Sequence, residues 1–123
     1  MNKKLYLIGA IVCSLLLWQP AAAQQSGFKT PQTAANALYA AWRTKNKIQA
    51  RAAADNDAIA KLFSTKFQPK WKFAGCNDES DTEKGLFQCV YKDASDDLLS
   101  VAFDTFKTKR GWRIRSLTFG AEE

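Results

Sequence analysis

Few residues in this chain could carry acid–base chemistry. A proton-transfer site needs a carboxyl or a tyrosine whose surroundings shift its pKa, and histidine, the usual proton carrier near neutral pH, is absent. Asp104 is the best candidate, because it interrupts an apolar run over residues 101–106. Tyr39 and Tyr91 could face the same cavity. In the alternative, which we favour, Asp104 points into solvent, both tyrosines lie at the edge of the core, and there is no catalytic residue.

Two acidic segments, residues 78–83 and 93–97, are the candidates for a metal site. Calcium favours several oxygen ligands from one loop, but neither segment has the spacing or the central glycine of a calcium-binding loop. In an antiparallel meander the two segments lie at opposite ends of the sheet, so they cannot share an ion. Without histidine, and with oxidised cysteines, a zinc site is also excluded. We therefore expect solvated turns, no metal and no cofactor.

Residues 1–23 resemble a secretory signal peptide. Two lysines precede an apolar run over residues 5–18, Pro20 interrupts it, and three alanines follow where signal peptidase requires small residues. The run is shorter than the roughly 20 apolar residues of a membrane-spanning helix. We expect cleavage after Ala23, a periplasmic or secreted protein, and no stable membrane insertion after cleavage.

Cleavage would leave two of the three cysteines, Cys76 and Cys89. One intramolecular pairing is then available, and an oxidising compartment favours it. Cys76 ends one alternating segment and Cys89 lies inside the next, so a disulfide between them would fix the register of two strands. A cross-link that closes a loop of this length contributes about 3 kcal/mol.

Helical periodicity is confined to the first half of the predicted mature chain. Thr30 and Pro31 predict the start of a helix, which continues with apolar residues at helical spacing as far as a break at Asn46. A second, alanine-rich helix is expected over residues 47–54, with Ile48 and one of the last alanines facing inward. A third short helix follows, capped by Asp55 or by the next residue.

After Pro69 the apolar period changes to 2, which predicts β-strands joined by turn-forming residues. Such short connections make neighbouring strands antiparallel. In the last strand, residues 112 and 114 occupy one face and residues 117 and 119 the other, so we predict a β-bulge near residues 115–116. The four predicted strands cover residues 70–76, 86–92, 98–106 and 112–119.

The order of these segments resembles the nuclear transport factor 2-like (cystatin-like cone) superfamily. The residues that carry the resemblance are 30–42, the polar break at 45–47, the helix at 58–63 and the ending at 111–119. The resemblance implies an α+β fold in which three N-terminal helices cover the concave side of a curved four-stranded antiparallel sheet. It also implies one domain over residues 30–123, after a flexible lead-in at 24–29.

Members of this superfamily include isomerases, dehydratases, cyclases and hydrolases with acid and base residues inside the cone, and also domains without known chemistry. The absence of histidine departs from the enzymes. The predicted cone could hold a small apolar ligand, or its aromatic side chains could fill it, which we favour. The residues expected to line it are Trp42, Phe63, Trp71, Phe73, Phe103 and Trp112.

The net charge of +6 over 123 residues is unevenly distributed. Residues 24–75 hold nine basic and two acidic residues, whereas residues 76–123 hold seven and ten. The helical half is therefore expected to present either an ordinary solvated face or a basic surface for an anionic envelope component. Its basic residues are Arg43, Lys45, Lys47, Arg51, Lys61, Lys66, Lys70 and Lys72, with Lys29 in the lead-in.

Nucleic acid is not an expected partner. In the segment 70–73, lysines alternate with aromatic residues, so the two kinds of side chain fall on opposite faces of a strand and form no stacking strip. Export would also separate the protein from most nucleic acid. The alternation indicates ordinary amphipathic patterning.

We expect a small, non-enzymatic binding or accessory domain whose ligand the sequence does not specify. Two alternatives remain: an isomerase, dehydratase or cyclase that uses Asp104 with a tyrosine, and an interaction module, such as an inhibitor of an extracellular enzyme, that uses the basic helical face. An open cavity with an inward carboxylate would favour the enzyme. An open apolar cavity would favour ligand binding, and a filled interior would favour interactions through the surface. The sequence specifies no oligomeric state.

Overall fold

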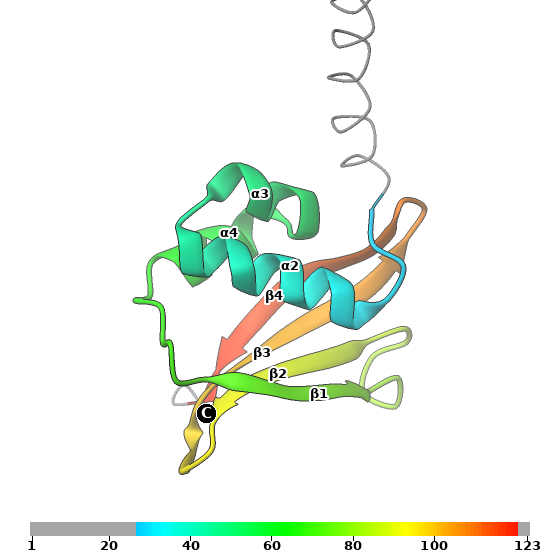
Figure 1. Cartoon of the computed structure of the whole chain (residues 1–123). Coiled ribbons are helices and arrows are strands. Elements are labelled where there is room, and N and C mark those ends of the chain that lie inside the picture. The colour runs from blue at the N-terminus through cyan, green and yellow to red at the C-terminus, as the bar shows by residue number, and fades with distance from the viewer. Residues whose placement is uncertain (1–26, 121–123) are drawn as a thin grey trace, which may run out of the picture.

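Three helices lie on one face of a four-stranded antiparallel sheet (Figure 1). The computed structural model describes residues 27–120, so the predicted signal peptide and residues 24–26 of the lead-in lie outside the described residues. The strand order is β1-β2-β3-β4, a simple meander. This architecture confirms the predicted α+β class. The elements are α2 (Pro31–Thr44), α3 (Lys47–Ala53), α4 (Asn56–Phe63), β1 (Lys72–Asp78), β2 (Phe87–Asp93), β3 (Asp96–Thr108) and β4 (Gly111–Phe119).

Helix α2 begins and ends where its sequence provides caps. The Thr33 backbone N–H donates to Thr30 Oγ1 (3.1 Å), and the Thr30 N–H donates to Thr33 Oγ1 (3.2 Å), which forms a capping box. Pro31 occupies the first turn, where no donor is needed. The helix ends at Thr44 and is capped by Lys45, whose backbone is left-handed with φ of 56°. The predicted apolar stripe is buried against the rest of the core.

Helix α3 packs through its alanines, and the inward position predicted for Ile48 is wrong. Ala50 and Ala53 are fully buried, whereas 77% of the Ile48 surface is exposed. The reason is geometric: α3 has only seven residues, and the face that carries residues 50 and 53 meets the other elements. Ile48 lies on a different face. The helix ends at Ala53, one residue before the predicted end.

Strand β1 is shifted along the chain from its predicted position. It covers residues 72–78, because the Trp71 backbone N–H donates to the Gln68 carbonyl in a turn (3.2 Å). Cys76 therefore lies inside the strand and not at its end. Strand β3 is longer than predicted and spans thirteen residues.

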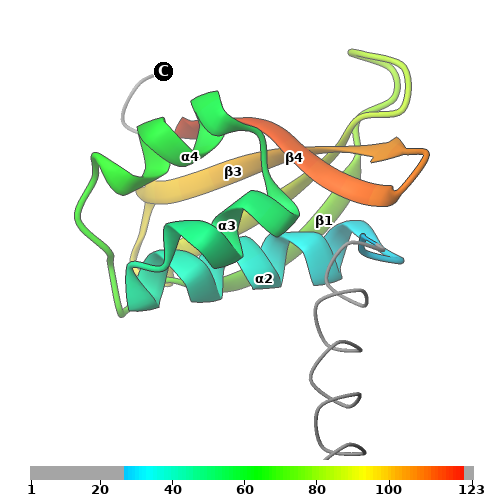
Figure 2. The same cartoon turned by 90° about the horizontal axis from the view of Figure 1, so that it is seen from above.

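Two β-bulges bring apolar side chains onto the face that the helices cover. The register of β3 against β4 passes from Ser116 to Ile114 and leaves Arg115 as the extra residue, which confirms the bulge predicted near 115–116. A second bulge in β1 leaves Ala74 unpaired. Bulges increase local twist and bend the strand that contains them, and the sheet curves around the helices (Figure 2).

The predicted disulfide is present. Cys76 and Cys89 lie directly opposite each other in β1 and β2, with Cα atoms 3.9 Å apart. Cys89 is fully buried, and Cys76 packs against the core. The bond therefore joins an edge strand to the sheet on the side that faces the helices.

Candidate binding surface

Aromatic side chains fill the space between α2 and the sheet. Trp42 is only 2% exposed, and its Nε1–H donates to the Thr65 carbonyl oxygen (2.9 Å). Four aromatic rings have centroids between 5.0 and 6.3 Å from the Trp42 ring, a spacing typical of packed aromatic pairs. They belong to Tyr39, Phe67, Trp71 and Phe119. The interior around Trp42 is therefore packed, as we favoured from the sequence.

The six residues expected to line a cavity do not line one together. Phe103 and Trp71 are buried in the core, while Phe63 and Phe73 are partly buried against it. Trp112 lies near the start of β4, and its ring meets the Phe87 ring edge-on at 5.2 Å. The first four and Trp42 pack in or against the core, although Trp42 and Phe63 also line one surface hollow and Trp112 lines two others.

Tyr39 and Tyr91 stack on each other; Tyr91 is buried in the core, and Tyr39 is partly buried against it. Their ring centroids are 4.0 Å apart and their planes differ by 5°. Tyr39 donates its hydroxyl proton to the carbonyl oxygens of Gln68 (3.1 Å) and Trp71 (3.0 Å), and Tyr91 donates to Asn36 Oδ1. Burial raises the pKa of both hydroxyls, and for Tyr91 the nearby Tyr39 raises it further. Both hydroxyls are therefore neutral donors near neutral pH.

Asp104 lies on the opposite face of the sheet from these tyrosines. It alternates in β3 with the buried side chains of Phe103 and Thr105. Its carboxylate accepts hydrogen bonds from Gln88 Nε2 (3.0 Å) and Ser116 Oγ (2.8 Å), its neighbours on the adjacent strands. The structure does not bring Asp104 and a tyrosine into one site.

The acidic turns are occupied by local hydrogen bonds. Asp78 accepts from the backbone and hydroxyl of Ser80, and Asp93 accepts in the same way from Ser95. These hydrogen bonds are the main cause that lowers the pKa of both carboxyls. Among residues 27–120, no cluster of three or more histidine, cysteine or acidic side chains could hold a metal ion.

The basic residues of the helical half divide into separate groups. Lys72 lies in β1 and pairs in register with Lys92 of β2, so it belongs to the strands and not to the helical surface. Three other lysines surround a hollow of about 500 Å³ where α2, α3 and α4 come together, with Phe63 and Phe67 among its walls. We call this group the turn cluster; it consists of Lys45, Lys47 and Lys66.

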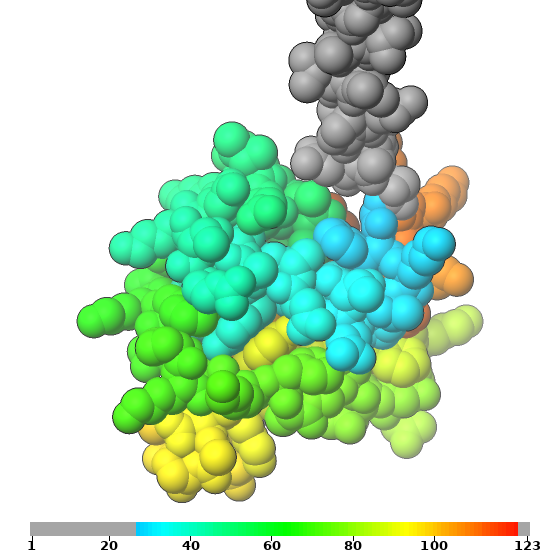
Figure 3. All heavy atoms as spheres, viewed as in Figure 1, coloured from blue at the N-terminus to red at the C-terminus, as the bar shows by residue number. Residues whose placement is uncertain are grey.

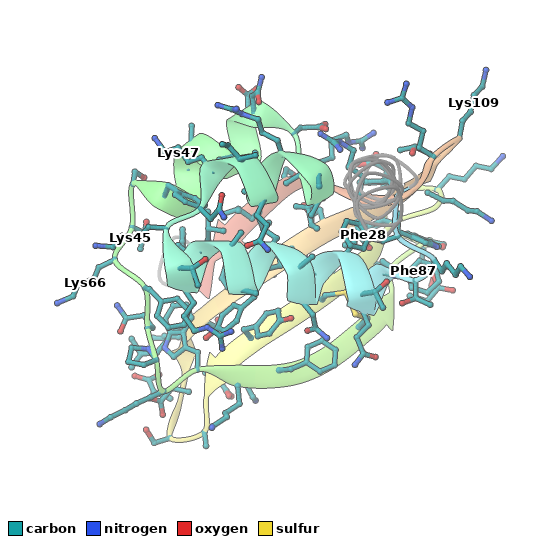
Figure 4. All side chains as sticks on the ribbon, turned by 45° about the horizontal axis from the view of Figure 1, so that its top comes forward. Phe28, Lys45, Lys47, Lys66, Phe87 and Lys109 are labelled. Carbon is teal, nitrogen blue, oxygen red and sulfur yellow. A yellow bond between two sulfur atoms is a disulfide. The ribbon has the colours of Figure 1, made fainter. Side chains whose placement is uncertain are left out.

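A second basic group lies at the other end of the helical layer, where Figure 4 shows Lys109 and Phe28. It surrounds two adjoining hollows of about 560 and 390 Å³, and among residues 27–120 no acidic side chain lines either hollow. Arg113 also reaches this region, but it is held by Asp55 (2.6 Å) and by the Ala54 carbonyl oxygen (2.7 Å). We call the remaining five residues the hairpin cluster: Lys29, Arg51, Lys107, Lys109 and Arg110.

A close backbone crossing assembles the hairpin cluster. The Trp112 N–H donates to the Phe28 carbonyl oxygen (2.8 Å), so the segment before α2 runs beside the turn between β3 and β4. Gly111 permits this approach, because a Cβ atom there would lie 2.5 Å from the same oxygen, and its φ of 120° favours glycine. The charge distribution along the sequence does not reveal the cluster, because three of its residues lie in the half of the chain with net negative charge.

The side chains of both clusters are free of ion pairs with the carboxylates of the described residues, 27–120. The ion pairs within that range lie elsewhere: Lys92 with Asp97, Arg115 with Glu83, and the Arg113 pair described above. These eight cations, which have no ion-pair partner among residues 27–120, form regions of positive potential that attract anions; five belong to residues 29–66 and three to the β3–β4 hairpin.

None of the helices in residues 27–120 is long and apolar enough to span a membrane. No protein-family model, no curated protein and no solved structure matches the chain.

Proposed function

We propose that this chain is an exported, non-enzymatic binding domain that attaches to an anionic envelope component through the outer surface of its helical layer. The observation that carries the proposal is the contrast between the packed interior around Trp42 and the eight unpaired cations of the turn and hairpin clusters. Export is part of the proposal; the leader-like N-terminal sequence supports it, and the Cys76–Cys89 disulfide is compatible with it.

An anionic lipid surface is the partner that suits this arrangement. The clusters lie at the two ends of the helical layer (Figure 4), so an extended negative surface could contact both. Each Lys or Arg near such a surface contributes about 1 kcal/mol of attraction. Several residues acting together then give binding that weakens as the salt concentration rises.

Membership in the nuclear transport factor 2-like superfamily is also proposed. The order of three helices before four antiparallel strands and the curvature of the sheet support it. The enzymatic alternative receives no such support, because Asp104 and the tyrosines lie on opposite faces of the sheet.

Sedimentation with lipid vesicles tests the attachment. We expect the mature protein to bind vesicles that contain phosphatidylglycerol, to bind phosphatidylcholine vesicles at least tenfold more weakly, and to dissociate as salt is added. The double variants Lys45→Glu/Lys47→Glu and Lys109→Glu/Arg110→Glu should each weaken binding at least tenfold.

The matched control is Lys72→Glu/Lys92→Glu, which makes the same change in net charge on neighbouring positions of β1 and β2. It should bind nearly as well as the unmodified protein. Equal losses in all three double variants would show that only net charge matters and would overturn the proposed surface. Absence of binding to anionic vesicles at low salt would overturn it as well.

A further inference from the structure

An uncharged groove lies on the outside of the helical layer, between α2 and α3. Its volume is about 470 Å³, within the range of small-molecule sites. Figure 3 shows α2 and α3 forming the outer surface above β1. None of the described side chains, from residues 27–120, that line the groove is charged, and its apolar lining comes from Phe28, Ala37, Ala40, Ile48 and Ala52.

Small side chains keep the groove open. Ala37 and Ala40 are three residues apart on α2 and therefore lie on the same side of that helix, and Ala52 lines the groove from α3. Each of these side chains is a single methyl group. A longer apolar side chain at any of the three positions would occupy space that is now empty, as the rings around Trp42 do in the interior.

Ile48 is the feature of the groove that the fold does not explain. It is the most exposed large apolar side chain of the described residues, at 77%, yet it lines the groove. Burying an isoleucine side chain stabilises a protein or a complex by roughly 1.5–3 kcal/mol. Ile48 gains little of this in the folded chain, so a ligand in the groove would supply the missing contact.

The groove leads to positive charge at one end. Gly27 and Ala52 line both the groove and the larger hollow of the hairpin cluster, so the two are continuous. Arg51, next to Ala52 in the chain, also lines that hollow, with Lys109 and Arg110 from the β3–β4 turn. A ligand with an apolar chain in the groove would therefore place its polar end among three cations.

We propose that the groove binds the hydrocarbon chain of a single-chain anionic lipid, whose headgroup contacts Arg51, Lys109 and Arg110. The placement of the headgroup rests on the proposed attachment to anionic envelope components. The binding of a hydrocarbon chain in the groove rests only on the groove's apolar lining. A second copy of the chain fits less well, because it would bring the same positive cluster against this one. A neutral lipid would leave the cations of the hairpin cluster without partners.

Three probes separate the contributions of chain and charge. Lauric acid has both, lauryl alcohol has only the chain, and acetate has only the charge. Calorimetric titration of the mature protein, below the concentration at which lauric acid forms micelles, should show binding of lauric acid. The alcohol should bind at least tenfold more weakly, and acetate should not bind measurably.

Two variants test whether lauric acid binds in the groove. Ala52→Leu should weaken lauric acid binding at least tenfold by filling the apolar subsite, and Ile48→Gln should weaken it several-fold. The matched control for the first is Ala60→Leu, an alanine that is exposed on α4 and does not line the groove. Its affinity for lauric acid should match that of the unmodified protein.

A third groove variant distinguishes this proposal from the proposed attachment. Ala40→Leu should also weaken lauric acid binding but should still bind phosphatidylglycerol vesicles, since Ala40 lines the groove and neither hollow of the hairpin cluster. Equal weakening by Ala52→Leu and Ala60→Leu, or equal binding of lauric acid and lauryl alcohol, would overturn the proposal even if vesicle binding holds. A dimer that Ala52→Leu abolishes, without any response to lauric acid, would assign the groove to a second copy and overturn it too.

Discussion

The two sides of helix α2 differ in the size of the side chains that meet there. On the inner side, Trp42 and the rings around it close the space above the sheet. On the outer side, Ala37 and Ala40 face α3 across a groove of about 470 Å³. Both sides are apolar, so hydrophobicity does not distinguish them. The volume of the side chains decides where the protein is filled and where it stays open.

This difference separates folding from binding. Filled space stabilises the native state, because buried atoms lose contact with water and gain contact with one another. Open apolar space contributes little to stability and is available to a ligand. Changes on the inner side of α2 should therefore alter the free energy of unfolding, and changes on the outer side should alter affinity.

The largest effect is expected from emptying the interior. Phe103 is fully buried beneath the helices, and Phe103→Ala should lower the free energy of unfolding by about 3–5 kcal/mol. Filling the groove with Ala52→Leu should change it by less than about 1 kcal/mol. Urea denaturation followed by tryptophan fluorescence measures both, and Phe103→Leu serves as a milder variant if Phe103→Ala does not fold. Equal losses of the free energy of unfolding in Phe103→Ala and Ala52→Leu would contradict the difference between the inner and outer sides of α2.

The disulfide should contribute the next largest amount. It joins β1 to β2 on the side that faces the helices, and replacing both cysteines by serine should lower the free energy of unfolding by about 3 kcal/mol. Affinity for lauric acid should persist as long as the variant is folded, because Cys76 and Cys89 do not line the groove. A loss of stability near zero would show that the sheet holds β1 without the bond.

Alkaline pH should lower the free energy of unfolding through the two tyrosines on the inner side of α2. Burial raises the pKa of Tyr39 and Tyr91 in the folded chain, so unfolded tyrosines ionise first. The stability that depends on the neutral hydroxyls is fully present below about pH 10 and is lost as the pH rises through and beyond that value. Urea midpoints should therefore fall steeply above about pH 10, and Tyr91→Phe should flatten that fall. An identical pH dependence in the variant and the unmodified protein would show that ionisation of Tyr91 does not cause the loss of stability.

The smallest effect concerns Lys45, the residue that caps the end of α2. Its left-handed backbone, with φ of 56°, is a conformation that glycine adopts without strain. Lys45→Gly should raise the free energy of unfolding by up to about 1 kcal/mol, while weakening the binding of anionic vesicles. Denaturation and vesicle sedimentation measure the two quantities. A variant that is more stable and binds anionic vesicles equally well would show that the Lys45 side chain does not contribute to vesicle binding.

Local patterns predicted the elements of the fold because those patterns act over a few residues. The caps at Thr30 and Asn46 start helices where expected. The bulge at Arg115 follows from the change of apolar phase within one strand. The side favoured for Asp104, away from the core, follows from an equally local pattern, because Asp104 is the immediate neighbour of Phe103 in a strand and must point the other way.

The candidate surface could not be predicted in the same way, because it depends on contacts between distant segments. Lys29 and Lys109 come together through the hydrogen bond between Phe28 and Trp112, and no local pattern encodes that crossing. Ile48 shows the same limit: its place in a helix was predicted, but the side of the helix that is covered depends on which elements pack against α3.

Methyl and backbone NMR shifts during a titration with lauric acid show whether the ligand enters the interior of the domain or binds on the outside of the helical layer. We expect the largest shifts at Ala37, Ile48 and Ala52, with little change at Trp42, Tyr91 and Phe103. The largest shifts at Trp42, Tyr91 and Phe103 would contradict this expectation, because the ligand would then have entered the space that the aromatic rings fill.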